Sequence, residues 1–249
     1  PHTLGHRRLQ ATLAQVIEQG VPAVRCVAHT KIGQGLGYRI GRRARLQRAP
    51  AELPFGKVAQ RVLMQHPPEE LRCGMGEVIK YGFIRDAELF TYLEQNLDAA
   101  LACNRNVLLE LVKRSAAIKA DVVSRDEREQ NLRMILNFGH TFGHALEAEL
   151  RFSGIRHGEA VILGMQCALE YTRLVYGLES GFYNRGLELL KRVPVSFPPE
   201  DIDPPRLVKR MALDKKVMAK QIRLVLVDEP GKCRIEPADN AGALLKAWD

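Results

Sequence analysis

The stretch Asn137-Phe138-Gly139-His140-Thr141-Phe142-Gly143-His144-Ala145 is the part of the sequence around which the other features can be arranged. Its two histidines are four residues apart, so in a helix of 3.6 residues per turn they share one face. Imidazole is the commonest metal ligand that proteins offer. A metal site is therefore the first hypothesis, although histidines at this spacing also occur on surfaces and at helix ends without any ligand.

The residues around these histidines predict one continuous helix over residues 131–151 with a single polar stripe. Most other positions hold leucine, phenylalanine or small residues, and a helix that is apolar nearly all round is buried. Buried polar side chains need partners, so we expect the stripe to line an internal cleft that holds a metal, an anion or both. Gly139 and Gly143 are poor choices inside a helix and predict that another group approaches its backbone closely. The stripe consists of Arg133, Asn137, His140, His144 and Glu147.

Length and composition predict a globular protein of one or two domains. The chain has 249 residues, of which 46% are hydrophobic. No stretch reaches the roughly 18 apolar residues of a membrane span, and the start lacks the apolar core of a signal peptide. Five scattered cysteines without a Cys-x-x-Cys pair predict a reducing, cytoplasmic location. A disulfide framework and a cysteine-based zinc site are therefore not expected.

The net charge of +8 is concentrated at the start of the chain. Residues 1–50 contain nine of the 37 Lys and Arg residues but only one of the 29 Asp and Glu residues, so the rest of the chain is neutral. Gly33, Gly35 and Gly37 lack the strand-before, helix-after context of a phosphate-binding loop. We expect a solvated arm, with an arm that binds nucleic-acid phosphates as the alternative.

Residues 67–249 are predicted to form a helical domain with one β-hairpin. Pro67-Pro68-Glu69-Glu70 is a favourable helix start, because proline suits the first turn and acids suit the positive end of the helix dipole. Asp86 and Asn104 are expected to cap the next two helices, and Asp239 the last one. The predicted helices cover about residues 67–81, 87–101, 105–123, 131–151, 157–177, 182–192, 206–213 and 240–248, and the hairpin pairs 221–227 with 233–236.

Two further residues complete the metal hypothesis. His157 follows the central helix across a loop and can return to the same cleft, and Glu77 can supply a carboxylate. Two histidines, one carboxylate and an open position are typical of catalytic zinc. Whether His140 and His144 are both ligands stays open at this point. The zincin peptidase motif is excluded, because it needs glutamate directly after the first histidine, where Thr141 stands.

Cationic and hydrogen-bonding side chains are expected in the same cleft. They imply a small anionic substrate that bears carboxylate or phosphate. The alternative for Glu77 and Lys80, three residues apart on one helix face, is an exposed ion pair of little energetic weight. The residues alone therefore predict a metal-dependent enzyme acting on a small phosphorylated or carboxylated hydroxy compound. The expected side chains are Lys80, Lys119, Arg133, Asn137, Lys215 and Lys216.

Six ordered motifs between residue 67 and about residue 236 resemble the C-terminal, metal-binding domain of the 3-dehydroquinate synthase family. The resemblance implies a mainly α, multi-helix domain of the dehydroquinate-synthase type with a small β-hairpin near the C-terminus. It also implies a cytoplasmic enzyme of aromatic amino-acid biosynthesis in the shikimate pathway. The motifs are Glu77-Val78-Ile79-Lys80-Tyr81-Gly82, Lys119-Ala120-Asp121-Val122-Val123, Asp126-Glu127-Arg128-Glu129, residues 136–145, His157-Gly158-Glu159-Ala160-Val161 and Asp214-Lys215-Lys216.

The resemblance implies a role for each candidate residue. Zinc, or cobalt, would be bound by Glu77, His140 and His157. In the family, NAD transiently oxidises the C5 hydroxyl of 3-deoxy-D-arabino-heptulosonate 7-phosphate, phosphate is eliminated, the ketone is reduced again, and an aldol closure gives 3-dehydroquinate. The residues that would contact this substrate are Lys80, Lys119, Arg133, Asn137, His144 and a lysine of 215–216.

The resemblance does not extend to residues 1–66. The family places NAD in an N-terminal Rossmann-like domain, whose motifs are not recognisable here. We expect this basic segment to be divergent or truncated, and irregular or a remnant of an α/β domain. The expected partner is a small anionic sugar phosphate, in preference to a membrane or nucleic acid, and a homodimer is left open.

Two alternatives remain at this stage. One is a related sugar-phosphate cyclase such as 2-deoxy-scyllo-inosose synthase, although Arg133 and the Lys215-Lys216 pair favour a substrate with a carboxylate. The other is a non-catalytic metal-binding domain whose basic arm binds nucleic acid or a partner.

Overall fold

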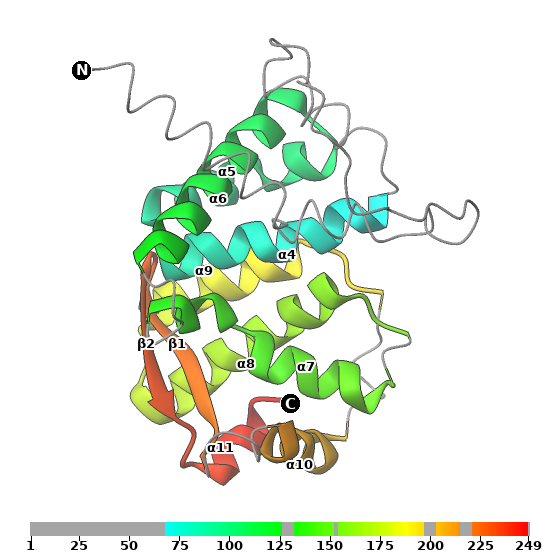
Figure 1. The fold of residues 1–249 in the computed structure, drawn as a ribbon, viewed down its shortest axis with the longest axis vertical. Helices are drawn as coiled ribbons and strands as arrows, with labels where there is room; N and C mark the ends of the chain where they lie inside the picture. The colour runs from blue at the N-terminus through cyan, green and yellow to red at the C-terminus, as the bar shows by residue number, and fades with distance from the viewer. Residues whose placement is uncertain (1–67, 126–131, 152–153, 197–202, 215–220, 249) are drawn as a thin grey trace, which may run out of the picture.

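The computed structural model describes residues 68–125, 132–151, 154–196, 203–214 and 221–248 (Figure 1). The prediction of a mainly helical fold with one antiparallel hairpin near the C-terminus is confirmed. The expectations for residues 1–66 lie outside the described residues. The elements are α4 (Pro68–Ile84), α5 (Ala87–Leu101), α6 (Arg105–Arg125), the 3₁₀ helix η1 (Leu132–Asn137), α7 (His140–Glu149), α8 (His157–Tyr176), α9 (Ser180–Lys191), α10 (Pro204–Asp214), β1 (Arg223–Glu229), β2 (Lys232–Pro237) and α11 (Ala241–Lys246).

Side-chain caps explain where several helices begin. Asp86 accepts a hydrogen bond from the Leu89 amide at 2.9 Å and so starts α5, and Asn104 starts α6 in the same way. These two predicted caps are confirmed. The last helix is capped by Asn240 and not, as expected, by Asp239, whose carboxylate accepts a hydrogen bond from a side chain before β1.

The predicted continuous helix over residues 131–151 is wrong. The structure has η1 followed by α7, with the junction at Gly139, whose φ of +78° lies in the left-handed region. A Cβ on Gly139 would lie 2.6 Å from Met165 Cγ and 2.8 Å from the Val161 carbonyl oxygen of α8. Both the conformation and the contact therefore require glycine, and the helix breaks there. The expected close approach at Gly139 and Gly143 is confirmed, and the approaching element is α8.

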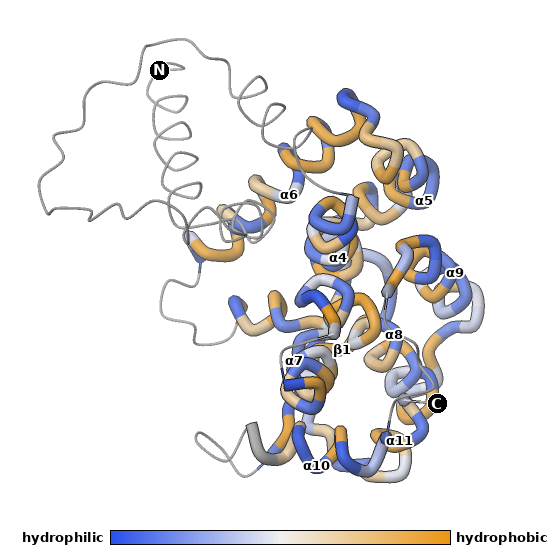
Figure 2. The backbone as a smooth tube through the Cα atoms, turned by 90° about the vertical axis from the view of Figure 1, so that its right-hand side faces the viewer, coloured by the Kyte–Doolittle hydropathy of each residue, from blue (hydrophilic) through white to orange (hydrophobic). Residues whose placement is uncertain are grey.

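Helix α8 runs through the middle of the described body (Figure 2). It contacts α4, α7, α9, α11 and β1 and is buried on most of its faces. Glycines let the backbones approach closely. A Cβ on Gly158 would lie 2.1 Å from the Cys73 carbonyl oxygen of α4, and one on Gly164 would lie 2.0 Å from the Gly139 carbonyl oxygen. These contacts fix the first turn of α8 against α4 and its middle against the start of α7.

Four phenylalanines hold the junction of η1 and α7 onto α4. Phe138 lies against Phe83 of α4, with ring centroids 5.4 Å apart. Phe83 in turn contacts Phe90 of α5 at 5.0 Å and Phe182 of α9 at 6.1 Å. All four rings are buried, and burying one such side chain contributes about 1.5–3 kcal/mol. Because Phe138 directly precedes Gly139, this cluster positions the first residue of α7 relative to α4.

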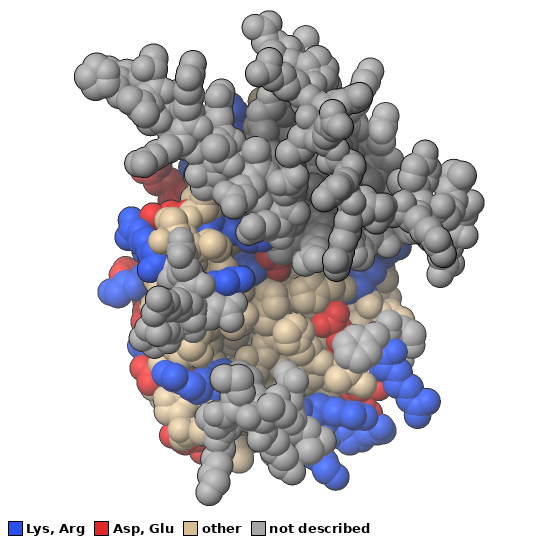
Figure 3. Space-filling model, in the orientation of Figure 1, with Lys and Arg blue, Asp and Glu red and all other residues tan. Residues whose placement is uncertain are grey.

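The surface of the described body carries both signs of charge. On the face shown in Figure 3, Lys and Arg side chains lie mainly at the margins and are interspersed with Asp and Glu. This agrees with the balanced charge of the sequence after residue 50. None of the described helices is both long enough and apolar enough to cross a membrane.

Replacing Gly164 with alanine should destabilise the protein by about 1–3 kcal/mol, because the new Cβ would overlap a backbone oxygen. That oxygen belongs to Gly139 and would lie 2.0 Å away. Urea unfolding followed by circular dichroism measures the change. Gly242→Ala in α11 is the matched control, since its Cβ would meet only the Asn240 side chain at 3.5 Å and alanine favours a helix. Equal unfolding midpoints for the two variants would contradict the role of the α8 contact.

Candidate metal and substrate site

Helix α4 carries Glu77 and Lys80 into the interior of the fold. Only 5% of Glu77 and 2% of Lys80 is exposed, and Lys80 Nζ donates to Glu77 Oε2 at 2.7 Å. The interpretation as an exposed surface ion pair is therefore wrong, because α8 and η1 pack against α4. Desolvating an ion pair is costly, so a buried pair is weak evidence for stability and points to another role.

His140 is the first residue of α7, and the preceding turn sets its ring orientation. Nδ1 lies 3.2 Å from the Phe138 carbonyl oxygen, which can only accept, so Nδ1 carries the hydrogen and Nε2 has the lone pair. This Nε2 lies 3.5 Å from Glu77 Oε1. Burial and the charge of Lys80 lower the pKa of His140 to about 3. The ring is therefore neutral at pH 7, as a metal ligand must be.

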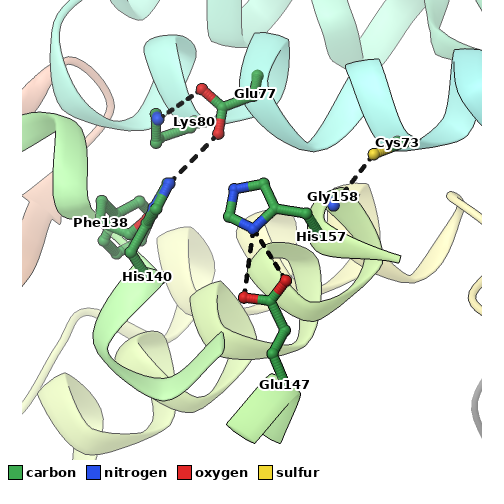
Figure 4. A network of polar contacts seen from close by, with 8 residues as sticks. All are labelled: Cys73, Glu77, Lys80, Phe138, His140, Glu147, His157 and Gly158. Atoms are coloured by element: carbon green, nitrogen blue, oxygen red, sulfur yellow. Dashed lines mark hydrogen bonds and ion pairs between the residues drawn. The ribbon is translucent and has the colours of Figure 1, made fainter. Parts of the chain in front are cut away.

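His157 is the first residue of α8, and Glu147 of α7 sets its orientation (Figure 4). Nδ1 lies 3.1 and 3.3 Å from the two carboxylate oxygens of Glu147 and donates to them, which leaves Nε2 on the side of Glu77. The same hydrogen bond raises the pKa of His157. A carboxylate on the far nitrogen commonly fixes the ring and tautomer of a metal-binding histidine.

Glu77, His140 and His157 fit the requirements of a metal site. One ligand atom of each lies within 4.8 Å of the other two, and a carboxylate with two imidazoles is a typical zinc ligand set. Glu77 Oε1 is buried and has no hydrogen-bond partner among the described residues. Such an oxygen costs about 1–3 kcal/mol, which a cation bound between it and the two rings would offset. Burial favours the protonated acid, but the charge of Lys80 lowers the pKa of Glu77 and keeps it ionised.

A pocket of about 380 Å³ opens beside Glu77 and His140. Three cationic side chains from three elements meet there, namely Lys80 from α4, Lys119 from α6 and Arg133 from η1. Converging cations favour a small ligand with more than one anionic group. The other lining residues are Tyr81, Met134, Leu136 and Asn137.

Some of the predicted site residues do not line this pocket. His144 is exposed and lies beside His140, with ring centroids 5.5 Å apart. His157 borders the pocket through the metal-ligand group and is not part of its wall. Lys215 and Lys216 lie outside the described residues, so their contact with a substrate stays a prediction.

The sequence assigns no role to two residues that the structure brings to the site. Glu147 belongs to the predicted polar stripe, but its partner His157 is on another helix. Tyr81 is buried and lines the pocket. The sequence feature that could have predicted Tyr81 as a site residue is its position four residues after Glu77, which places both on one face of α4.

A larger pocket, of about 630 Å³, lies between α8, α9 and α11. Its carboxylate, Glu170, already accepts hydrogen bonds from Arg173 and from the Tyr183 hydroxyl. The candidate metal-ligand groups among the described residues all lie elsewhere. Chemistry, and not size, therefore identifies the smaller pocket as the candidate site.

Replacing Glu147 with glutamine should weaken zinc binding at the site of Glu77, His140 and His157 by about 10–100-fold, the range seen for carboxylates that orient a ligating histidine. The neutral amide would hold the His157 ring less firmly. Competition with a chromophoric chelator measures the affinity. Glu149→Gln is the matched control, because Glu149 is on the same helix but pairs with Arg206 and Arg210. Zinc affinities that do not differ between the two variants would show that Glu147 does not position His157.

Curated proteins similar to this chain are named 3-dehydroquinate synthase. The enzyme of Saccharophagus degradans is 43% identical over 185 residues, which is 74% of this chain and 51% of that protein. The enzyme of Pseudomonas aeruginosa (strain UCBPP-PA14) is 44% identical over 167 residues, which is 66% of this chain and 45% of that protein. The chain thus spans about half the length of the curated relatives that it matches.

Solved structures share the fold at low sequence identity. The 2-epi-5-epi-valiolone synthase of Streptomyces hygroscopicus subsp. jinggangensis, with NAD⁺ and Zn²⁺ bound, has a TM-score of 0.67 at 22% identity over 76% of this chain and 52% of that chain. A 2-deoxy-scyllo-inosose synthase complexed with carbaglucose-6-phosphate, NAD⁺ and Co²⁺ has a TM-score of 0.66 at 22% identity over 76% and 53%.

The family comparison covers the part of the chain that holds these side chains. Residues 74–217, more than half of the chain, match the family described as 3-dehydroquinate synthase C-terminal. This range includes Glu77, Lys119, Arg133, His140 and His157. The protein therefore belongs to the 3-dehydroquinate synthase family, through the C-terminal domain of that family.

Proposed function

We propose that this chain provides the metal- and substrate-binding part of a 3-dehydroquinate synthase. The reaction would convert 3-deoxy-D-arabino-heptulosonate 7-phosphate to 3-dehydroquinate and phosphate, as a carbon–oxygen lyase of cytoplasmic aromatic amino-acid biosynthesis. The observation that carries this proposal is the buried, unpaired oxygen of Glu77, which faces His140 beside a pocket with three cationic side chains. The identity of 43–44% to curated enzymes of that name supports it.

Glu77, His140 and His157 would hold the metal, and Zn²⁺ or Co²⁺ is bound in the solved relatives. When bound, such a metal polarises hydroxyl and carbonyl oxygens of a substrate. The protein's part is to aim both imidazoles. The Phe138 carbonyl does this for His140, and Glu147 does it for His157, because each accepts the hydrogen of Nδ1 and so leaves Nε2 turned toward the metal. Burial and the charge of Lys80 keep His140 neutral.

The cationic side chains would bind the anionic groups of the substrate. Lys80 uses one of its hydrogens for Glu77 and has two left for a ligand. Lys119 and Arg133 approach from α6 and η1, so phosphate and carboxylate can be held at a fixed separation. These charges are in place before the substrate binds and would stabilise charge on the departing phosphate. The family resemblance adds Asn137, His144 and a lysine of 215–216 as further substrate contacts.

NAD would be bound by a part of the protein other than residues 67–249. We place a domain boundary between the basic segment 1–66 and this helical domain, and the family match, which begins at residue 74, is in line with it. Both solved relatives contain NAD⁺, and this chain covers about half of each. The hydride carrier would therefore complete the site from outside the described residues.

A related sugar-phosphate cyclase is the second candidate, because the fold is shared with 2-deoxy-scyllo-inosose synthase. A ligand such as carbaglucose 6-phosphate has a phosphate but no carboxylate. The three cations of the pocket favour a ligand with both groups. A metal-binding domain without catalysis is the third candidate, and it would bind zinc but not the heptulosonate phosphate.

Lys119→Ala should lower the affinity for 3-deoxy-D-arabino-heptulosonate 7-phosphate by roughly tenfold or more, because a hydrogen bond to a charged group contributes about 1.5–3 kcal/mol. Calorimetric titration of the zinc-loaded chain measures this. Lys113→Ala is the matched control, since Lys113 is on the same helix but is exposed and outside the pocket. If both variants bind the compound equally well, the pocket is not its site.

Phosphate release from the same compound tests the reaction itself. Release should require both NAD and zinc and should be lost in His140→Ala, because that variant removes a metal ligand. Carbaglucose 6-phosphate should bind more weakly than the heptulosonate phosphate. Tighter binding of carbaglucose 6-phosphate would favour the related cyclase, and no binding of either compound would favour the non-catalytic domain.

A further inference from the structure

Three histidine rings and two carboxylates gather where α4, α7 and α8 meet. The ring centroids of His140, His144 and His157 are 5.3, 5.5 and 6.0 Å apart. Glu77 and Glu147 lie on opposite sides of His157 (Figure 4). The metal site described above uses only Glu77, His140 and one nitrogen of His157. His144, Glu147 and the second nitrogen of His157 remain.

The remaining groups have the arrangement of a second ligand set. One ligand atom each of His144, Glu147 and His157 lies within 4.8 Å of the other two. His144 and Glu147 are three residues apart on α7 and so share one face of that helix. His157 begins α8, which packs along α7. Two imidazoles and a carboxylate are a suitable donor set for Zn²⁺ and similar divalent ions.

This second set lies outside the wall of the pocket beside Glu77. His144 is exposed, and neither His144 nor Glu147 lines the pocket beside Glu77. The His144 ring touches the other two histidine rings, but among the described residues it has no hydrogen-bond partner. Within the described part of the chain, the nitrogens of His144 are therefore available to an ion.

We propose that His144, Glu147 and His157 form a second divalent-cation site, the outer site, distinct from the inner site of Glu77, His140 and His157. The ion would be Zn²⁺ or another transition-metal ion of similar ligand preference. It would replace the hydrogen that His157 Nδ1 now donates to Glu147, and this proton would pass to solvent. The inference rests on the proposed function only because the inner site, which belongs to that function, has His157 in common with the outer site.

Sharing His157 makes the two sites interfere with each other. With an ion on each nitrogen, one imidazole would separate two positive charges that repel. The outer site also lies at the surface, where water competes for the ion. It therefore binds more weakly than the inner site, and filling it withdraws His144 from the substrate contact proposed above.

Calorimetric titration of the 249-residue chain with zinc tests this proposal. The unsubstituted protein should give one tight and one weaker binding event. His144→Ala should lose the weaker event and keep the tight one. His140→Ala should lose the tight event and keep the weaker one, and His157→Ala should weaken both. His144→Gln is a second variant at the exposed position, and circular dichroism checks that each variant is folded.

Either of two results would overturn the proposal. One is a single event in the unsubstituted protein, and the other is a weaker event that persists in both His144 variants, which would assign it to histidines elsewhere in the chain. No readout here uses the heptulosonate phosphate or its turnover. Failure of the outer site is therefore distinguishable from failure of the proposed function.

Discussion

The close backbone contact of α8 with α4 and with the start of α7 is the constraint on which the site depends. Gly158 and Gly164 bring the backbones to distances that any Cβ would prevent. The contact at Gly164 falls on Gly139, where the chain turns with positive φ and begins α7 at His140. The contact at Gly158 holds the first turn of α8, which His157 opens, against α4. Both histidines are thus aimed by packing of the main chain.

This packing also buries a carboxylate that the fold does not fully satisfy. Glu77 shares one oxygen with Lys80, while the other has no hydrogen bond among the described residues. In a protein interior without a metal, such an oxygen lowers the stability of the fold, whereas at a metal site it serves as a ligand. The charge of Lys80 lowers the pKa of Glu77, and burial together with Lys80 lowers the pKa of His140. Glu77 therefore stays charged and His140 stays neutral. A site for a cation is therefore built into the protein before any ion binds.

Local signals in the sequence predicted most helices, and they failed where a distant element intervenes. Asp86 and Asn104 cap α5 and α6 because a cap needs only its own helix. The helix predicted over residues 131–151 is broken because α8, which comes later in the chain, occupies the space beside Gly139. For the same reason spacing could not tell whether Glu77 and Lys80 were exposed or buried.

The sequence by itself determined the helical class, the hairpin and the residue types of the site, since periodicity, caps and the metal-ligand character of histidine and glutamate are local properties. It also separated the basic residues 1–50 from the neutral remainder. Only the tertiary structure decided which nitrogen of each histidine is available and that Glu147 holds His157. The hydrogen bond between α7 and α8 and the burial of α4 against other elements both depend on residues far apart in the chain. Such contacts do not appear in the local periodicity of the sequence.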